Sequence, residues 1–357
     1  MAVEQRRSQV LDLSRPGTVG VEIDVAEAAE VLMSIAAVLD EDDETFDLGR
    51  DHLAAARDAI SPETAALIER LAFRGEKCAA YLLGIVYELP APRTFAALLE
   101  RLHAMDATEV KLHLLGYYSS ANHLVEADVI KAAALGDEAA IDTFVEALSG
   151  YGFKQEIART LLGLGPDVVK ASLVDLLPLW YEEVFRPHSD GWQEAAERDA
   201  EAKRAAAGNH TPEQMVELAT NGFQYTPAAG VRTLVFFPSW WMRPWVILWE
   251  HKGAKIFCYP LRLEQGEGGT SPTELARLYK ALGDEGRLRL LRRLSEGSLR
   301  LSEAATELGV AKSTAHHHLA ILRHAGLVTI REEDEKVYNL RRDTVPQAGA
   351  LLESFLA

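Results

Sequence analysis

A short basic run near the carboxyl end of the chain has the residue types needed to contact a nucleic acid. Residues 311–331 hold three Lys and Arg, four His and no Asp or Glu. Contact with phosphate requires such local positive charge. Lys312, Ser313 and Thr314 stand at the start of an expected helix, where side chains and backbone amides can meet phosphates and base edges. We therefore expect double-stranded DNA to be the partner.

The elements around this run predict a helix-turn-helix followed by a two-stranded wing, over residues 301–340. Ser302 is an N-cap for a first short helix, and Gly309 with Val310 makes a tight turn. A second helix covers 312–325. This order of elements is typical of a protein that places its second helix in the DNA major groove.

Apolar residues on the second helix recur at spacings of four and three, which predicts one buried face: Ala315, Leu319 and Leu322. Side chains off that face are available to DNA. We assign base and phosphate contact to Lys312, Ser313, Thr314, His316 and His317. We assign contact with phosphate alone to Arg323, Arg331 and Lys336.

The three consecutive histidines, His316 to His318, invite comparison with a metal site. Neighbouring residues of a helix point about 100° apart, so three in a row cannot converge on one ion. A helical zinc pair has a spacing of three or four. We therefore assign this helix to DNA contact and predict neither a metal nor a cofactor.

Two further helices are expected to flank the motif, over 272–282 and 345–356. Both carry apolar stripes. Such stripes are suited to pairing two subunits, so we predict a homodimer.

Residues in this region resemble the ArsR family of bacterial winged-helix transcription regulators. The similarity rests on an opening Leu-Gly-Asp with a following Arg-Leu, on the recognition helix, and on the residues after it. These residues are Leu282, Gly283, Asp284, Arg287, Leu288, His317, His318, Leu319, Leu322, Ala325, Gly326, Leu327 and Val328. The resemblance covers about 75 residues. It implies a dimeric regulator that binds operator DNA, often as a repressor released by a metal or another signal.

The chain departs from that family in three places. The expected wing tip, 332–335, is wholly acidic where a basic tip is usual. Residues 299–308 contain no Cys, so a soft-metal sensor is not expected there. About 270 residues precede the motif. This long part resembles, more weakly, a group of ArsR-like regulators with a large amino-terminal region of unknown function.

Composition shifts along the chain predict two domains that are mainly α with small β elements. A larger α-rich (α+β) domain over 1–263 contains a Trp-rich β element at 231–263. A polar, Gly-rich linker, 264–271, leads to the winged helix-turn-helix domain, 272–357. Near the amino end we expect a strand over 18–23 and a helix that Asp24 caps.

Four tryptophans gather around the β element. With Arg243 they have two interpretations. Aromatic walls with a few polar groups can line a pocket for a small-molecule effector. Aromatic side chains more often form a packed β-core or a dimer surface. Both interpretations stay open for Trp240, Trp241, Trp245, Trp249 and Arg243.

The bulk composition narrows the class of protein. The net charge is -17, but residues 271–357 hold 13 Lys and Arg against 12 Asp and Glu. The acidity therefore lies outside the winged segment. Two Cys in 357 residues, without a leader or a long apolar run, predict a cytoplasmic protein that is not membrane-bound. Phosphate-loop and nucleophile-elbow motifs are missing, so we expect no enzyme.

These observations predict a DNA-binding transcription regulator, acting as a repressor, with an amino-terminal domain that responds to a non-metal signal. The alternative is an interaction protein, in which the winged domain serves dimerisation and the acidic domain binds a protein partner. The acidic wing and the net charge favour the alternative. The acid-free run at 311–331 favours DNA binding.

Overall fold

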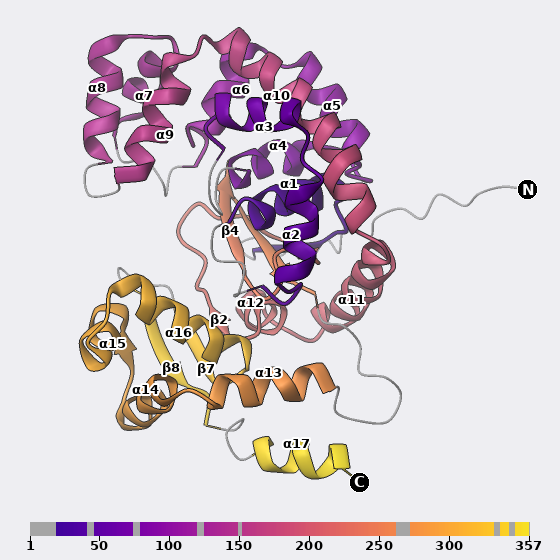
Figure 1. The fold of residues 1–357 in the computed structure, drawn as a ribbon, viewed down its shortest axis with the longest axis vertical. Helices are drawn as coiled ribbons and strands as arrows, with labels where there is room; N and C mark the ends of the chain where they lie inside the picture. Colours follow the sequence, from indigo (N-terminus) through magenta and orange to yellow (C-terminus); the bar gives the residue numbers. More distant parts are fainter. Residues whose placement is uncertain are drawn as a thin grey trace, which may run out of the picture. The chain divides into compact units, whose positions relative to one another are not determined.

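The computed structural model describes residues 19–40, 46–73, 79–119, 125–148, 152–261, 272–331, 336–342 and 347–356. The chain forms two compact units, and α-helix is its main secondary structure, as predicted. Figure 1 labels the elements along the sequence. Unit 1 comprises residues 1–201 and 230–261, and unit 2 comprises 202–229 and 262–357.

This division differs from the expected domains at residues 202–229. The sequence pattern places them inside one domain over 1–263, whereas they fold with the winged domain. The physical reason is a strand within this segment that pairs with the wing. The expected linker, 264–271, lies outside the described residues.

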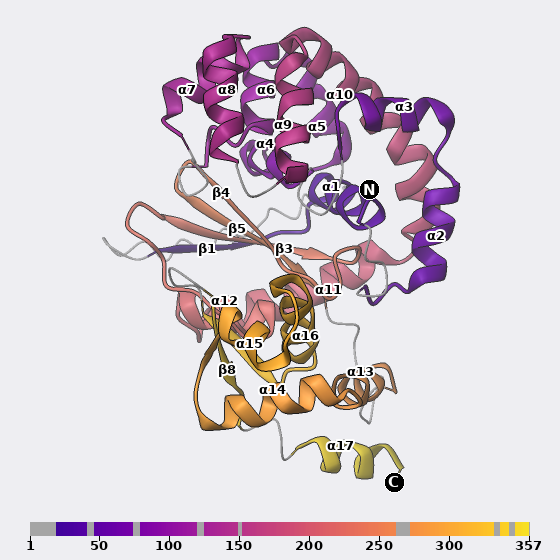
Figure 2. The same ribbon diagram turned by 60° about the vertical axis from the view of Figure 1, so that its left-hand side comes forward.

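Unit 1 is built on a four-stranded sheet in the order β1-β3-β5-β4. The first three strands run parallel, and β4 is antiparallel to β5. Figure 2 shows α1 (Glu27–Val38) and α4 (Leu83–Glu88) on one face of this sheet. The strands are β1 (Gly20–Ile23), β3 (Thr233–Ser239), β4 (Ile247–His251) and β5 (Ala254–Pro260).

Strand β3 is buried on both faces, which explains its continuous apolar sequence. Val235 and Phe237 belong to the core that the sheet shares with the helices of unit 1, and Leu234 and Phe236 are buried as well. Strands β3, β4 and β5 all lie within the β element that the sequence predicts at 231–263.

The helices of unit 1 surround the same core. Helix α3 begins after an N-cap at Ser61, whose hydroxyl accepts the Thr64 N–H at 3.2 Å. The helices are α1 (Glu27–Val38), α2 (Arg50–Asp58), α3 (Pro62–Arg70), α4 (Leu83–Glu88), α5 (Phe95–Ala104), α6 (Ala107–Leu114), α7 (Ala127–Ala134), α8 (Glu138–Ala147), α9 (Gly152–Gly163) and α10 (Pro166–Trp180). Helix α11 (Trp192–Ala207) continues from unit 1 into unit 2.

Asp24 does not cap the first helix, contrary to the sequence prediction. The N-cap is Ala26, and α1 begins at Glu27. The Asp24 carboxylate instead lies 2.5 Å from the buried guanidinium of Arg93. An ion pair with a partner far along the chain has taken the side chain away from the local helix end.

Unit 2 contains the predicted helix-turn-helix and wing within a four-stranded sheet, ordered β2-β7-β8-β6. Its wing strands β7 and β8 are antiparallel, and β2 joins β7 in parallel from an earlier part of the chain. The helices are α12 (Pro212–Thr220), α13 (Pro272–Leu282), α14 (Glu285–Glu296), α15 (Leu301–Leu308), α16 (Lys312–His324) and α17 (Gln347–Leu356). The strands are β2 (Phe223–Gln224), β6 (Leu299–Arg300), β7 (Val328–Arg331) and β8 (Val337–Leu340).

The close approach of Gly84 to His251 gives a test of the packing in unit 1. The His251 ring is fully buried, and its Nε2 lies 2.8 Å from the Glu88 carboxylate. A Cβ on Gly84 would lie 2.4 Å from His251 Nδ1. We expect Gly84→Ala to lower the free energy of unfolding by about 1–3 kcal/mol, because the buried ring would have to shift. Urea unfolding measures this change.

Gly163→Ala is the matched control, since a Cβ at this helical position meets nothing within 4 Å. Helix propensity predicts that the control is unchanged or slightly more stable. Equal stability of the two variants would contradict the packing argument.

Candidate nucleic-acid interface

The turn between α15 and α16 has the geometry that a helix-turn-helix requires. Gly309 adopts a left-handed conformation with φ of 70°, which favours glycine. The N–H of Val310 donates to the carbonyl of Ala305 at 3.1 Å, so α15 ends cleanly before α16 begins. The predicted turn at Gly309 and Val310 is therefore confirmed.

The buried face of α16 is the predicted one. Ala315, Leu319 and Leu322 are fully buried, and α16 packs against α14 and α15. Burying this face presents the first turn to solvent. Lys312, Ser313 and Thr314 are all exposed.

The amino-terminal end of α16 adds backbone donors to these side chains. Its N-cap residue, Ala311, provides no side-chain hydrogen bond to the first turn. The first amides of a helix lack partners inside the helix and carry the positive end of the helix dipole. This end of α16 is therefore suited to an anion such as a DNA phosphate.

The three consecutive histidines of α16, His316 to His318, are each half-buried. The rings of His317 and His318 have centroids 6.1 Å apart and planes inclined by 67°. His318 Nδ1 lies 3.6 Å from an oxygen of Asp284, which is too long for a hydrogen bond. Burial lowers the pKa of His318 and so favours the neutral ring.

Arg323 is not placed to contact phosphate, contrary to the sequence prediction. Its side chain is buried, and its Nη1 donates to the backbone carbonyl of Thr220 at 3.0 Å. Burial lowers the pKa of Arg323 to about 10. Spacing along α16 places this residue off the buried face, but a segment from before the winged domain covers it.

The wing presents two of the predicted cationic residues. Arg331 ends β7 and Lys336 precedes β8, and both are exposed. The acidic tip between them, 332–335, lies outside the described residues.

The four tryptophans of the predicted β element divide into two groups. Trp241 and Trp249 are buried in the core, where Trp241 Nε1 donates to the Ser189 hydroxyl at 2.9 Å. Trp240 and Trp245 are half-buried and pack against that core. Trp241 and Trp249 therefore belong to the core between the sheet and its helices.

Arg243 and Glu30 fix the loop that carries these tryptophans. The Arg243 guanidinium lies 4.0 Å from the centre of the Trp240 ring, and its Nε donates to the Trp240 carbonyl. One oxygen of Glu30 accepts the backbone N–H groups of Trp240 and Trp241 at 2.7 and 2.8 Å. Burial raises the pKa of Glu30 to about 7. Arg243 thus has a structural role in this loop.

The docking of residues 212–224 on the winged domain was not predicted. A local signal for the helix exists, since Thr211 and Gln214 form a capping box and Asn221-Gly222 is a turn pair. The pairing of β2 with β7 joins residues more than 100 positions apart, and local patterns carry no information about such pairs.

Comparison with known proteins identifies this domain. A sequence profile described as "Bacterial regulatory protein, arsR family" matches residues 284–329, from the start of α14 into β7. An uncharacterised HTH-type transcriptional regulator of Bacillus subtilis, YceK, is 39% identical over 72 residues, covering 19% of this chain and 72% of the relative. The chain belongs to the ArsR family.

Two further relatives agree. The regulator CmtR of Mycobacterium bovis is 38% identical over 85 residues, covering 23% of this chain and 72% of the relative. A homologue of the cadmium resistance regulatory protein CadC from Staphylococcus aureus is 35% identical over 69 residues, covering 19% of this chain and 57% of the relative. This ArsR-family protein is a DNA-binding transcriptional regulator. None of the helices in its described residues is long and apolar enough to span a membrane.

The N-cap of α14 provides a test at this surface. Asp284 Oδ1 accepts the Arg287 N–H at 2.8 Å, and this bond holds the pKa of Asp284 below its usual value. We expect Asp284→Ala to lower the free energy of unfolding of unit 2 by about 1 kcal/mol at pH 7. A depressed pKa stabilises the fold above the unfolded value near 3.9, and this stability is lost as the pH falls through the folded value. Urea unfolding between pH 3 and pH 7 measures both effects.

Asp284→Asn is the control, because asparagine also caps helices but does not titrate in this range. Its loss of stability should be small and should not vary with pH. A difference between the native protein and Asp284→Ala that grows as the pH falls would contradict the assigned sign.

Proposed function

We propose that this ArsR-family protein is a homodimeric transcriptional repressor in which α16 enters the major groove of operator DNA. The observation that carries the proposal is the exposed first turn of α16, with Lys312, Ser313 and Thr314 opposite a fully buried face. The amino-terminal residues of a recognition helix are those that reach base edges.

Charge supports the choice of unit 2 as the DNA-binding part. Unit 1 carries 21 Lys and Arg against 38 Asp and Glu, whereas unit 2 carries 16 of each. The whole net charge of -17 therefore resides in unit 1. Phosphates are repelled by such a unit.

The contact residues follow from exposure. We assign base and phosphate contact to Lys312, Ser313, Thr314, His316 and His317. We assign phosphate contact to Arg331 and Lys336, which are exposed at the two sides of the wing. Arg323 leaves the set because it is buried.

We expect the double variant Lys312→Ala and Thr314→Ala to bind the DNA upstream of the protein's own gene about tenfold more weakly. One cation that neutralises a phosphate, Lys312, is lost, so the slope of log affinity against log salt should fall by about one. Fluorescence anisotropy at several salt concentrations measures both quantities.

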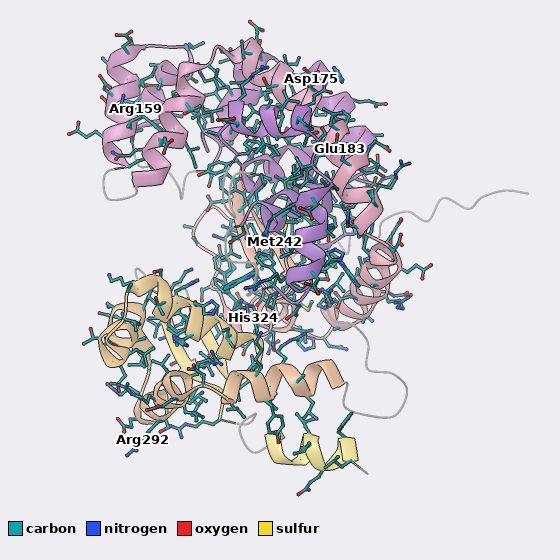
Figure 3. All side chains as sticks on the ribbon, in the orientation of Figure 1. Arg159, Asp175, Glu183, Met242, Arg292 and His324 are labelled. Atoms are coloured by element: carbon teal, nitrogen blue, oxygen red, sulfur yellow. The ribbon has the colours of Figure 1, made fainter. Side chains whose placement is uncertain are left out.

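Arg292→Ala is the matched control. Arg292 is an exposed cation on α14 of the same unit, and Figure 3 labels it. Its loss should leave affinity and slope unchanged. If the double variant behaves like this control, α16 is not the DNA-reading helix.

We propose that α13 and α17 form the dimer surface. The two helices pack against each other, and each exposes large apolar side chains: Tyr279 at 40%, Phe355 at 45% and Leu356 at 74%. Exposed apolar patches of this kind mark association surfaces. A second copy of the chain would cover them.

A charged substitution tests this surface. We expect the full chain to have the mass of a dimer by light scattering, and the double variant Phe355→Glu and Leu356→Glu to shift it toward the monomer. Leu135→Glu is the control, because Leu135 is 62% exposed in unit 1. A monomeric native chain, or a dimer that survives the double variant, would exclude this interface.

The signal that acts on the protein is proposed to be something other than a metal. The chain has two cysteines, Cys78 and Cys258. Cys258 is fully buried, and burial raises the pKa of its thiol, which disfavours the thiolate that soft metals require. Unit 1, which has its own core, is the proposed sensing part.

A further inference from the structure

Residues 212–224 form a helix and a strand, which we name the docking arm. The arm consists of α12 and β2 and belongs to unit 2. Asn221 ends α12 in a left-handed conformation with φ of 55°, and Gly222 follows with φ of 103°. These two residues turn the chain from the helix into the strand.

The junction of α12 and β2 in the docking arm contacts the carboxyl end of α16. The Thr220 carbonyl accepts Arg323 Nη1 at 3.0 Å, and Asn221 Nδ2 donates to the His324 carbonyl at 3.3 Å. Thr220 is the last residue of α12, so Arg323 sits at the negative end of that helix dipole. Arg323 and His324 are buried beneath the arm.

The strand of the docking arm, β2, contacts the wing. Phe223 and Gln224 pair in parallel with Ile330 and Arg331 of β7, and the Ile330 N–H donates to the Gly222 carbonyl at 2.9 Å. From the strand side, Arg341 Nη1 donates to Asn221 Oδ1 at 3.2 Å. Asn221 therefore bridges the end of α16 and the end of the wing.

We infer that Asn221 and Arg323 are positioning residues for DNA binding, which clamp the recognition helix and the wing in one geometry through the docking arm. Base contacts depend on the orientation of α16 within the domain. Contacts at the carboxyl end of α16, away from its first turn, hold that orientation. The inference rests on the proposed role of α16. It adds a determinant of affinity that does not itself touch DNA.

The docking arm also gives the clamp a covalent link to unit 1. Residues 1–201 and 230–261 belong to unit 1, so the segment 202–229 that contains the arm is joined to that unit at both ends.

The test uses the full chain and the DNA upstream of its own gene. Asn221→Gly keeps the left-handed backbone but removes both side-chain hydrogen bonds. Arg323→Met removes the guanidinium and keeps an apolar stem. We expect each variant to raise the Kd about tenfold, within the range of couplings between separate sites. The salt slope should not change, because no phosphate contact is lost.

Arg342→Met is the matched control. Arg342 is exposed, and its Nη2 donates to the Ser295 carbonyl, so the change removes the same charge and the same kind of bond outside the arm. Its Kd and slope should equal those of the native chain. The fraction of active protein is fixed by stoichiometric titration, so that unfolded material does not enter the Kd.

Two results overturn the inference. A Kd that is unchanged or lower in the folded Asn221→Gly protein means that the arm stabilises the fold without setting the DNA-binding geometry. A salt slope that falls by about one in Arg323→Met means that Arg323 contacts phosphate directly. Lys312→Ala, measured alongside, separates these failures from that of the proposed function: if it also has no effect, α16 does not read DNA.

Discussion

The burial of one face of α16 is the constraint on which the DNA-binding surface depends. Leu319 and Leu322 are fully buried. Each such side chain contributes about 1.5–3 kcal/mol when removed from water. Rotating α16 would expose them, so the packing fixes which residues of its first turn face solvent. The exposure of Lys312, Ser313 and Thr314 thus follows from the burial of the apolar residues on the opposite face of α16.

Much of unit 2 could be predicted from sequence because its signals are local. The spacing of Ala315, Leu319 and Leu322 and the position of Gly309 specify a helix, its buried face and the turn before it. The fate of Arg323 could not be predicted, because helical spacing says which side of α16 a residue occupies but not which distant segment covers that side. Pairing of β2 with β7 is a long-range contact of the same kind.

Unit 1 shows the same limit in a different form. The apolar runs that form β3 and β5 were visible, because strands buried on both faces leave continuous apolar sequence. The role of Trp241 was not visible, because an aromatic residue reads alike in a pocket wall and in a core. Its indole is held by the Ser189 hydroxyl, from the segment between α10 and α11. The Asp24 carboxylate likewise forms an ion pair with Arg93 and does not cap the adjacent helix.

The net charge is divided unequally between the two units. Unit 1 has a net charge of -17 and unit 2 has a net charge of zero. The segment of unit 2 that is joined to unit 1 at both ends contains the docking arm. We propose that attraction to DNA comes from local features of unit 2, namely the first turn of α16 and the cations of the wing. The proposed operator contacts depend on this first turn.

Site-specific photo-crosslinking tests directly whether the first turn of α16 contacts DNA. A photoreactive amino acid is placed at Ser313 of α16, and in a second protein at Ser295 of α14, both of which are exposed. We predict a covalent adduct with the duplex from position 313 and none from position 295. An adduct from position 295, with none from position 313, would show that the first turn of α16 does not contact DNA.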